Sequence, residues 1–154
     1  MHDTTAKILL VSSSGGVLLD LLALDVWWSR YSVAWAVVPA TDTCSALAGQ
    51  RVYSVRETSM RQPLSVLPSF VQAWRILRSE RPSLIVSAGS GPAIAFFVLA
   101  RLRGIPTFWV STLNILTTPG ISASICARFA SRVLLQHASL REAHPEGFVI
   151  GELY

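Results

Sequence analysis

Apolar residues alternate along the chain between short runs typical of buried strands and longer stretches with helical periodicity. The short runs predict strands at 7–11, 33–38, 52–55, 84–86, 107–110, 132–135 and 148–150. The longer stretches predict helices at 16–29, 43–48, 66–80, 91–103 and 120–130. Because strands separated by helices need crossover connections, the pattern predicts an α/β fold: a single Rossmann-like, doubly wound, mostly parallel sheet with helices on both faces.

The segment 66–80 has the clearest helical pattern. One stripe, which we expect to pack on the sheet, consists of Leu67, Phe70, Val71, Trp74 and Leu77.

The segment 16–29 has two apolar stripes instead of one. We expect the first to pack on the sheet and the second either to be buried between two layers or to face a membrane or a partner chain. The first stripe is Leu18, Leu19, Leu22 and Val26, and the second is Leu21, Leu24 and Trp28.

The composition adds a reason to expect a covered surface. With 154 residues the chain fits one domain, 1–154, and it is 51% hydrophobic but only 14% charged; an average protein is about 25% charged. The net charge is +4, and Lys7 is the only lysine among thirteen basic residues. The arginines are scattered without aromatic interleaving, which argues against nucleic acid and leaves anionic head groups or phosphates as partners.

The sequence argues against several other classes of protein, namely metal-binding, disulfide-rich, secreted and membrane-spanning ones. Cys44 and Cys126 have neither CxxC spacing nor nearby histidine pairs, so neither a metal nor a disulfide framework is indicated. We also expect no cofactor. The first residues lack a signal-peptide pattern, and charged residues interrupt each long apolar run before it could span a bilayer. We expect a cytoplasmic protein that lies on, rather than crosses, the membrane.

Two turns rich in glycine and serine follow predicted strands. In a parallel sheet such turns lie at the carboxyl ends of the strands, where ligands bind, and glycine lets the backbone come close to an anion. Neither turn has a dinucleotide or P-loop motif, so each alone is either structural or ligand-binding. The candidate phosphate or acceptor contacts are Ser12, Ser13, Ser14, Gly15 and Gly16 in the first turn, and Ser87, Gly89, Ser90 and Gly91 in the second.

Three further residues are candidates for the same cleft. Asp42 follows the second strand and is either a ribose-binding acid or a helix cap. Ser111 and Gln136 follow the fifth and sixth strands. No serine occupies a G-x-S-x-G elbow, so a hydrolytic triad has no support, and no catalytic residue is assigned.

At this point the sequence resembles a known family. The segments "ILLVSSSGG", "RPSLIVSAGSGPAIAFFVLARLRGIPTFWV" and "VIGELY" resemble bacterial exopolysaccharide-synthesis proteins of the PssD type. They also resemble the membrane-anchoring subunit of the eukaryotic dolichol-linked N-acetylglucosaminyltransferase. The resemblance implies the N-terminal, acceptor-side half of a split GT-B glycosyltransferase. A separate small subunit would bind most of the UDP-sugar, and the acceptor would be a lipid-linked saccharide.

The sequence departs from this family where chemistry is expected. Val17 stands in place of the histidine that opens the first helix, and Ser111 in place of a glutamate. Pro39 replaces an aspartate, although Asp42 matches a later acidic position. Valine cannot exchange a proton, so two functions remain open: a transferase subunit that works with its partner, or an inactive scaffold that docks a partner at the membrane.

Overall fold

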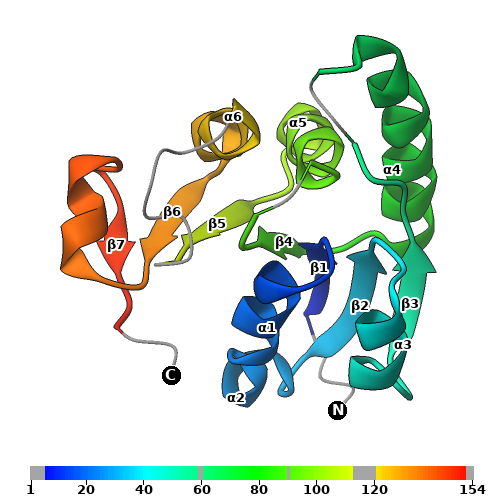
Figure 1. The fold of residues 1–154 in the computed structure, drawn as a ribbon, viewed down its shortest axis with the longest axis horizontal. Helices are drawn as coiled ribbons and strands as arrows, with labels where there is room; N and C mark the ends of the chain where they lie inside the picture. Colours follow the sequence, from blue (N-terminus) through cyan, green and yellow to red (C-terminus); the bar gives the residue numbers. More distant parts are fainter. Residues whose placement is uncertain (1–5, 59–60, 90, 113–120, 152–154) are drawn as a thin grey trace.

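A computed structural model of the protein describes residues 6–58, 61–89, 91–112 and 121–151. Its core is one sheet with the strand order β3-β2-β1-β4-β5-β6-β7, in which every neighbouring pair is parallel (Figure 1). The strands are β1 Lys7–Ser12, β2 Ser32–Val37, β3 Arg51–Ser54, β4 Leu84–Ser87, β5 Thr107–Ser111, β6 Arg132–Leu135 and β7 Phe148–Val149. The predicted strands and the doubly wound α/β class are confirmed.

Helices cover the sheet unequally. On one face, α4, α5 and α6 lie in a row, whereas α1, α2 and α3 lie on the other face, on the β1–β3 side of the sheet (Figure 1). The bounds are α1 Gly16–Leu22, α2 Asp25–Trp28, α3 Thr41–Ala46, α4 Val66–Glu80, α5 Ala93–Arg103 and α6 Ile121–Phe129, with short 3-10 helices η1 Pro63–Ser65 and η3 Ala138–Glu142.

The predicted helix at 16–29 is broken into α1 and α2. The Leu21 carbonyl accepts hydrogen bonds from the Leu24 N–H at 3.2 Å and from the buried Trp28 indole Nε1 at 2.9 Å. In a continuous α-helix this carbonyl would instead accept from the N–H of the residue four positions later.

The structure contradicts the expectation that Leu21, Leu24 and Trp28 form an outward membrane or partner face. Leu21 and Trp28 are buried and Leu24 is half-buried, whereas Leu19 and Val26 are exposed. The break ends the regular spacing after Leu22, so the two stripes do not continue from one helix to the next.

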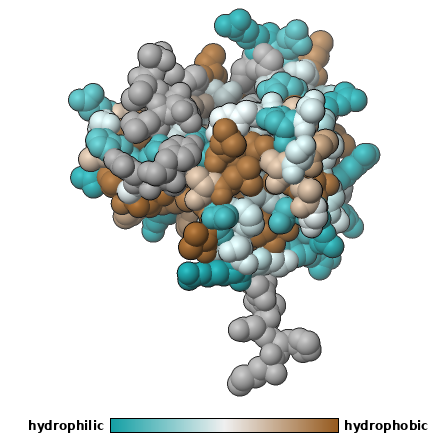
Figure 2. All heavy atoms as spheres, turned by 60° about the horizontal axis from the view of Figure 1, so that its bottom comes forward, coloured by the Kyte–Doolittle hydropathy of each residue, from teal (hydrophilic) through white to brown (hydrophobic). Residues whose placement is uncertain are grey.

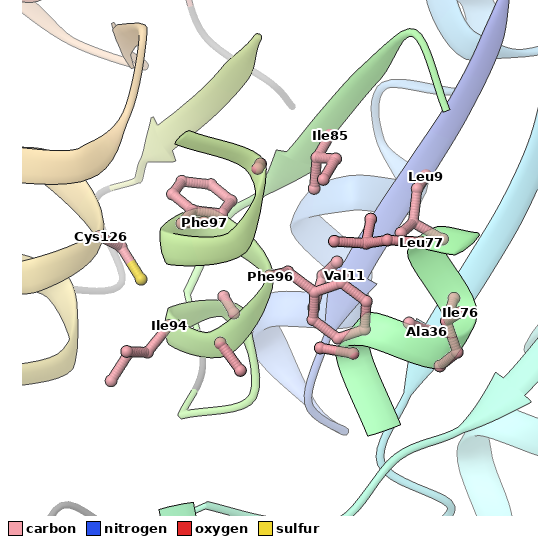
Figure 3. Close-up of a cluster of buried hydrophobic side chains, with 14 of the residues drawn as sticks. Leu9, Val11, Ala36, Ile76, Leu77, Ile85, Ile94, Phe96, Phe97 and Cys126 are labelled. Carbon is pink, nitrogen blue, oxygen red and sulfur yellow. The ribbon is translucent and has the colours of Figure 1, made fainter. Parts of the chain in front are cut away.

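The larger core cluster is centred on α5. Phe96 and Phe97 are buried between neighbouring helices, with Ile94 and Cys126 at the α6 side and Leu77 at the α4 side (Figure 3). Burial raises the pKa of the Cys126 thiol to about 12, so this cysteine is a packing residue rather than a nucleophile.

The inward face of α4 differs from the predicted stripe. Ser69, Ala73 and Ile76 are buried together with Leu77 and Glu80, whereas Leu67, Val71 and Trp74 are exposed. Small side chains let α4 pack closely against its neighbour α5, so the face bearing Ser69 and Ala73 turns inward although the opposite face is also apolar.

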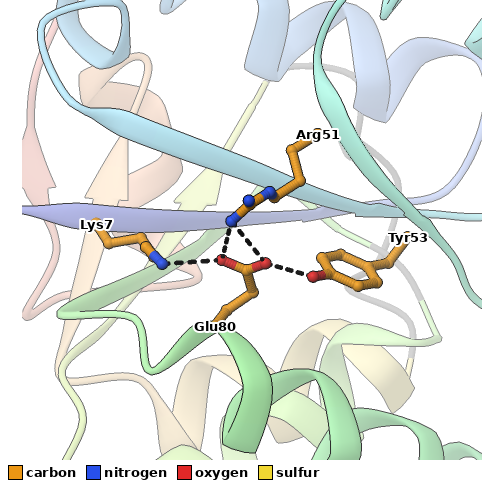
Figure 4. Close-up of polar contacts among 4 residues, drawn as sticks. All are labelled: Lys7, Arg51, Tyr53 and Glu80. Carbon is orange, nitrogen blue, oxygen red and sulfur yellow. Dashed lines mark hydrogen bonds and ion pairs between the residues drawn. The ribbon is translucent and has the colours of Figure 1, made fainter.

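Glu80, at the end of α4, is a buried carboxylate with three partners at the amino-terminal end of the sheet (Figure 4). Its oxygens lie 3.2 Å from Lys7 Nζ and 3.2 Å from an Arg51 guanidinium nitrogen, and they accept a hydrogen bond from the Tyr53 hydroxyl. Burial alone would raise the pKa of Glu80, but the hydrogen bonds from Tyr53 and Lys7 and the nearby positive charges outweigh it and lower that pKa. The cluster ties α4 to β1 and β3.

Candidate functional site

The strand order reverses direction between β1 and β4, which places the switch point of the sheet there. The two strands are direct neighbours, and Val11 pairs with Ser87. The first and second glycine turns therefore leave the sheet side by side at its carboxyl-terminal end. The expectation that the strands before the two turns are neighbours is confirmed.

The first turn, 12–16, is built largely by local contacts. The buried Ser12 hydroxyl donates to the Ser13 carbonyl at 2.7 Å, and the Ser13 hydroxyl lies 3.4 Å from the Ser14 carbonyl. Gly15 has a φ of 76°, which an L side chain adopts only with strain. Gly16 then begins α1, so glycine is needed at the bend itself.

Asp42 reaches the first turn from α3. Its Oδ2 accepts a hydrogen bond from the Gly15 N–H at 3.2 Å, across 27 positions of sequence. It does not cap α3: the Ala40 N–H instead donates to Thr43 Oγ1 at 2.8 Å. The capping interpretation is thus wrong, and Asp42 lies beside the candidate site.

The second turn is held by the buried Ser87 side chain, whose Oγ accepts from the Gly89 N–H at 3.3 Å. Gly89 has a φ of 142°. An ideal Cβ on Gly91 would lie 1.9 Å from the Thr58 carbonyl oxygen, so glycine at 91 is required by a close backbone approach. Ser90 lies outside the described residues.

Ser111 and Gln136 extend this end of the sheet beyond β4. Both are buried, and the Gln136 N–H donates to the Ser111 carbonyl at 3.0 Å. The structure thus places both at the ends of neighbouring strands, as predicted, and Ser111 is one strand away from the second turn.

Asp20 is a site-adjacent residue that the sequence reasoning did not select. It is buried on α1, and its Oδ2 accepts a hydrogen bond from the Thr112 hydroxyl at 2.9 Å, so it links α1 to the end of β5. An acidic residue among leucines was the available signal, because a buried carboxylate needs polar partners.

The described histidines and Val17 do not supply an evident base at the first turn. Val17 packs against the apolar cluster beneath the sheet. His137 caps η3, where its Nδ1 accepts from the Ser139 N–H at 3.1 Å. Burial lowers the pKa of His144.

An apolar groove of about 230 Å³ opens beneath β4–β6, on the face that α1–α3 leave uncovered. In Figure 2 this face carries a gathering of hydrophobic side chains. Its lining residues are Leu24, Trp27, Val86, Phe108, Val110, Leu134 and Ile150.

Among the described residues, no three histidine, cysteine or acidic side chains gather as a metal site would require. Within the same ranges, none of the helices combines the length and the apolar character needed to span a bilayer.

The known proteins most relevant to function are similar to the chain in sequence and share one enzyme name. No family model matches the chain. It is 29% identical over 96 residues to a UDP-N-acetylglucosamine–N-acetylmuramyl-(pentapeptide) pyrophosphoryl-undecaprenol N-acetylglucosamine transferase of Oceanobacillus iheyensis, covering 62% of this chain and 26% of that protein. The enzyme of the same name from Xylella fastidiosa is 40% identical over 72 residues, covering 47% and 19%. The chain thus matches about a quarter or less of these relatives.

Solved structures show the same fold. Acinetobacter baumannii MurG matches with a TM-score of 0.71 and 17% identity, over 96% of this chain and 44% of its own. The UDP-N-acetylglucosamine 2-epimerase of Rickettsia bellii matches with a TM-score of 0.71 and 12% identity, over 97% and 45%. The domain is the Rossmann-like half found in GT-B glycosyltransferases and these epimerases.

Proposed function

We propose that this chain is the acceptor-side, membrane-associated subunit of a two-component UDP-sugar glycosyltransferase, acting on a lipid-linked saccharide in polysaccharide biosynthesis. It would be a PssD-type protein, related to the eukaryotic dolichol-pathway subunit, with 1–154 as its single domain and the inner face of the cell membrane as its location. One observation carries the proposal: a chain similar in sequence to N-acetylglucosamine transferases forms one Rossmann-like half with two glycine turns at its switch point.

Sequence similarity favours transfer over epimerisation. The fold is shared by both enzyme classes and does not distinguish them. The curated relatives, by contrast, are transferases whose names specify a pyrophosphoryl-undecaprenol acceptor. We therefore assign transfer of a hexosyl or N-acetylhexosaminyl group.

The proposed reaction is displacement at the sugar's anomeric carbon. An acceptor hydroxyl forms the new glycosidic bond, the bond to UDP breaks, and UDP leaves with the electron pair while a base takes the hydroxyl proton. The two turns would hold the acceptor's pyrophosphate, and Asp42, Ser111 and Gln136 would bind its sugar. The partner would hold most of the UDP-sugar, and we assign the base to none of this chain's residues.

The groove beneath β4–β6 supports a partner subunit. Parallel sheets are ordinarily covered by helices on both faces, and among the described residues this groove is lined by apolar strand residues of which Phe108 and Leu134 are only half-buried. A second polypeptide that packs against this groove would bury them further.

A docking scaffold without catalytic contacts is the second candidate. It is favoured by Val17, whose side chain packs into the apolar cluster and offers no proton acceptor. A scaffold would bind the partner but would not need the turns for ligand binding.

Calorimetry with the isolated chain tests the acceptor-side assignment. We expect a short-chain polyprenyl-pyrophosphoryl saccharide to bind and UDP-N-acetylglucosamine to bind at least tenfold more weakly, because the partner holds most of the nucleotide sugar. Gly15→Ala should weaken acceptor binding by about tenfold, since the strained turn would shift away from the ligand.

Gly104→Ala is the matched control. Gly104 has a φ of 69° and, like Gly15, no atom within 4 Å of an added Cβ, but it ends α5 away from the turns. The two variants should lose similar stability while only Gly15→Ala loses affinity. Tight binding of UDP and none of the acceptor would instead identify an unrelated nucleotide-binding protein.

A further inference from the structure

The chain that leaves β3 lies against the candidate site, although it belongs to neither glycine turn. We call residues 54–58 the β3–α4 segment. β3 is separated from β4 by β2 and β1, yet the Thr58 carbonyl reaches the turn that follows β4. Its oxygen lies 1.9 Å from the position of an ideal Cβ on Gly91, so it packs directly against the main chain of the second turn.

One side chain of α4 holds the beginning of the β3–α4 segment. Gln72 Nε2 donates to the Ser54 carbonyl at 2.7 Å, and Gln72 Oε1 accepts from the Arg56 N–H at 3.2 Å. β3 is an edge strand, so these two contacts occupy main-chain groups that have no neighbouring strand. The segment therefore leaves the sheet along a path that α4 sets.

Thr58 is held to α4 by a chain of hydroxyl groups. Thr58 Oγ1 lies 2.6 Å from Ser69 Oγ, and Ser69 Oγ lies 3.3 Å from the Ser65 carbonyl oxygen; both hydroxyl-bearing side chains are buried. Each hydroxyl has one proton, and a carbonyl only accepts. Ser69 therefore donates to the Ser65 carbonyl, and Thr58 donates to Ser69. The other acceptor near Thr58, the Arg56 carbonyl, is 3.5 Å away.

The second glycine turn is thus supported from two sides. On one side Ser87 Oγ accepts from the Gly89 N–H at 3.3 Å, and on the other the Thr58 carbonyl packs against Gly91. The Gly91 carbonyl in turn accepts from the Ile94 N–H at 3.2 Å, at the start of α5. A displacement of Thr58 would therefore be transmitted both to the turn and to the first residues of α5.

A hydroxyl pair constrains this contact more than apolar packing would. A hydrogen bond has a preferred length and direction, whereas two apolar groups of the same size slide past one another at little cost. Groups that bind a ligand must be held within about 0.5 Å of their productive positions. The buried pair of Thr58 and Ser69 supplies such a constraint beside the second turn.

We propose that Thr58 is a positioning residue for the second glycine turn: its hydroxyl, through Ser69, fixes its carbonyl relative to α4, and the carbonyl holds Gly91 where the turn contacts the acceptor's pyrophosphate. Thr58 itself touches no substrate. The inference deepens the proposed function, on which it rests for the identity of the ligand. It makes affinity for the acceptor depend on a residue outside both turns.

Amide hydrogen exchange in the full chain, measured by NMR, tests the positioning role without a ligand. Thr58→Val keeps the shape of the side chain and removes the hydroxyl, while Ser69 keeps its bond to the Ser65 carbonyl. We expect exchange of the Gly89 and Ile94 amides to accelerate by about fivefold or more, with the amides of β1 unchanged. Thr58→Ser, which retains the hydroxyl, should exchange like the wild type.

Thr107→Val is the matched control. Thr107 is also a buried threonine, and its hydroxyl lies 3.4 Å from the Phe129 carbonyl oxygen, but it stands at the amino-terminal end of β5. This variant should leave the Gly89 and Ile94 amides unchanged. Unchanged exchange in Thr58→Val would overturn the inference. Acceleration throughout the sheet would also overturn it, because that result indicates a general loss of stability.

Calorimetry then connects the positioning role to the ligand. We expect Thr58→Val to bind a short-chain polyprenyl-pyrophosphoryl saccharide about fivefold more weakly than the wild type, and Thr58→Ser and Thr107→Val to bind it equally well. Unchanged affinity in Thr58→Val would overturn the inference and leave the proposed function standing. Absence of binding by the wild-type chain would contradict the proposed function and, with it, any role of Thr58 toward the acceptor.

Discussion

Replacing Glu80 with alanine is expected to lower the free energy of unfolding at pH 7 by about 3 kcal/mol. The change removes a buried carboxylate that receives a hydrogen bond from Tyr53 and pairs with Lys7 and Arg51. Lys7 and Arg51 retain access to water, with side-chain exposures of 33% and 61%, which limits the cost. Urea denaturation followed by circular dichroism measures the difference.

The effect should depend on pH in a defined direction. Because the folded state lowers the pKa of Glu80, its contribution is complete above the unfolded pKa of about 4.3 and is lost as pH falls through the lower folded value. The difference between the wild type and Glu80→Gln should therefore shrink below about pH 4. Glu142→Gln, at an exposed position of η3, should change little at either pH. Equal effects of the two variants would contradict the role of the cluster.

Gly91→Ala is expected to lower the free energy of unfolding by about 3 kcal/mol, at the upper end of overpacking costs. The added Cβ would lie 1.9 Å from the Thr58 carbonyl oxygen, so one of two backbone segments must move. Thermal or urea unfolding measures the loss.

Gly104→Ala separates this steric cost from backbone strain. Its φ of 69° disfavours alanine, but no atom lies within 4 Å of the added Cβ, so about 1–2 kcal/mol is expected. If Gly91→Ala cost no more than Gly104→Ala, the close approach of Thr58 to the second turn would be contradicted.

The central strands were predictable because each is a short apolar run bounded by turn-forming residues, and a buried parallel sheet requires such runs. The helix at 16–29 was not, because its break depends on the Trp28 indole donating to the Leu21 carbonyl. The inward face of α4 was also mispredicted. Apolar residues occupy more than one face of that helix, and the buried small residues Ser69 and Ala73 mark the face that packs.

The candidate site, like the fold, was predictable only in part. The neighbouring position of the two turns followed from strand order and the switch-point rule. The contact of Asp42 with Gly15 and that of Asp20 with Thr112 span 27 and 92 positions, so they depend on tertiary placement that local patterns do not encode. Leu21 and Trp28 were expected on an outward face but are buried, because exposure, unlike periodicity, is set by packing.

Sugar transfer by the reconstituted pair tests the central claim most directly. The chain would be co-expressed with a candidate partner glycosyltransferase subunit from the same genome, purified as a complex, and supplied with a UDP-sugar and a short-chain polyprenyl-pyrophosphoryl saccharide. We predict transfer that requires both polypeptides, that Gly15→Ala reduces at least tenfold, and that Gly104→Ala leaves within twofold of the wild type. Transfer unaffected by Gly15→Ala in an intact complex would favour the scaffold, and the absence of both complex and transfer would contradict the proposed function.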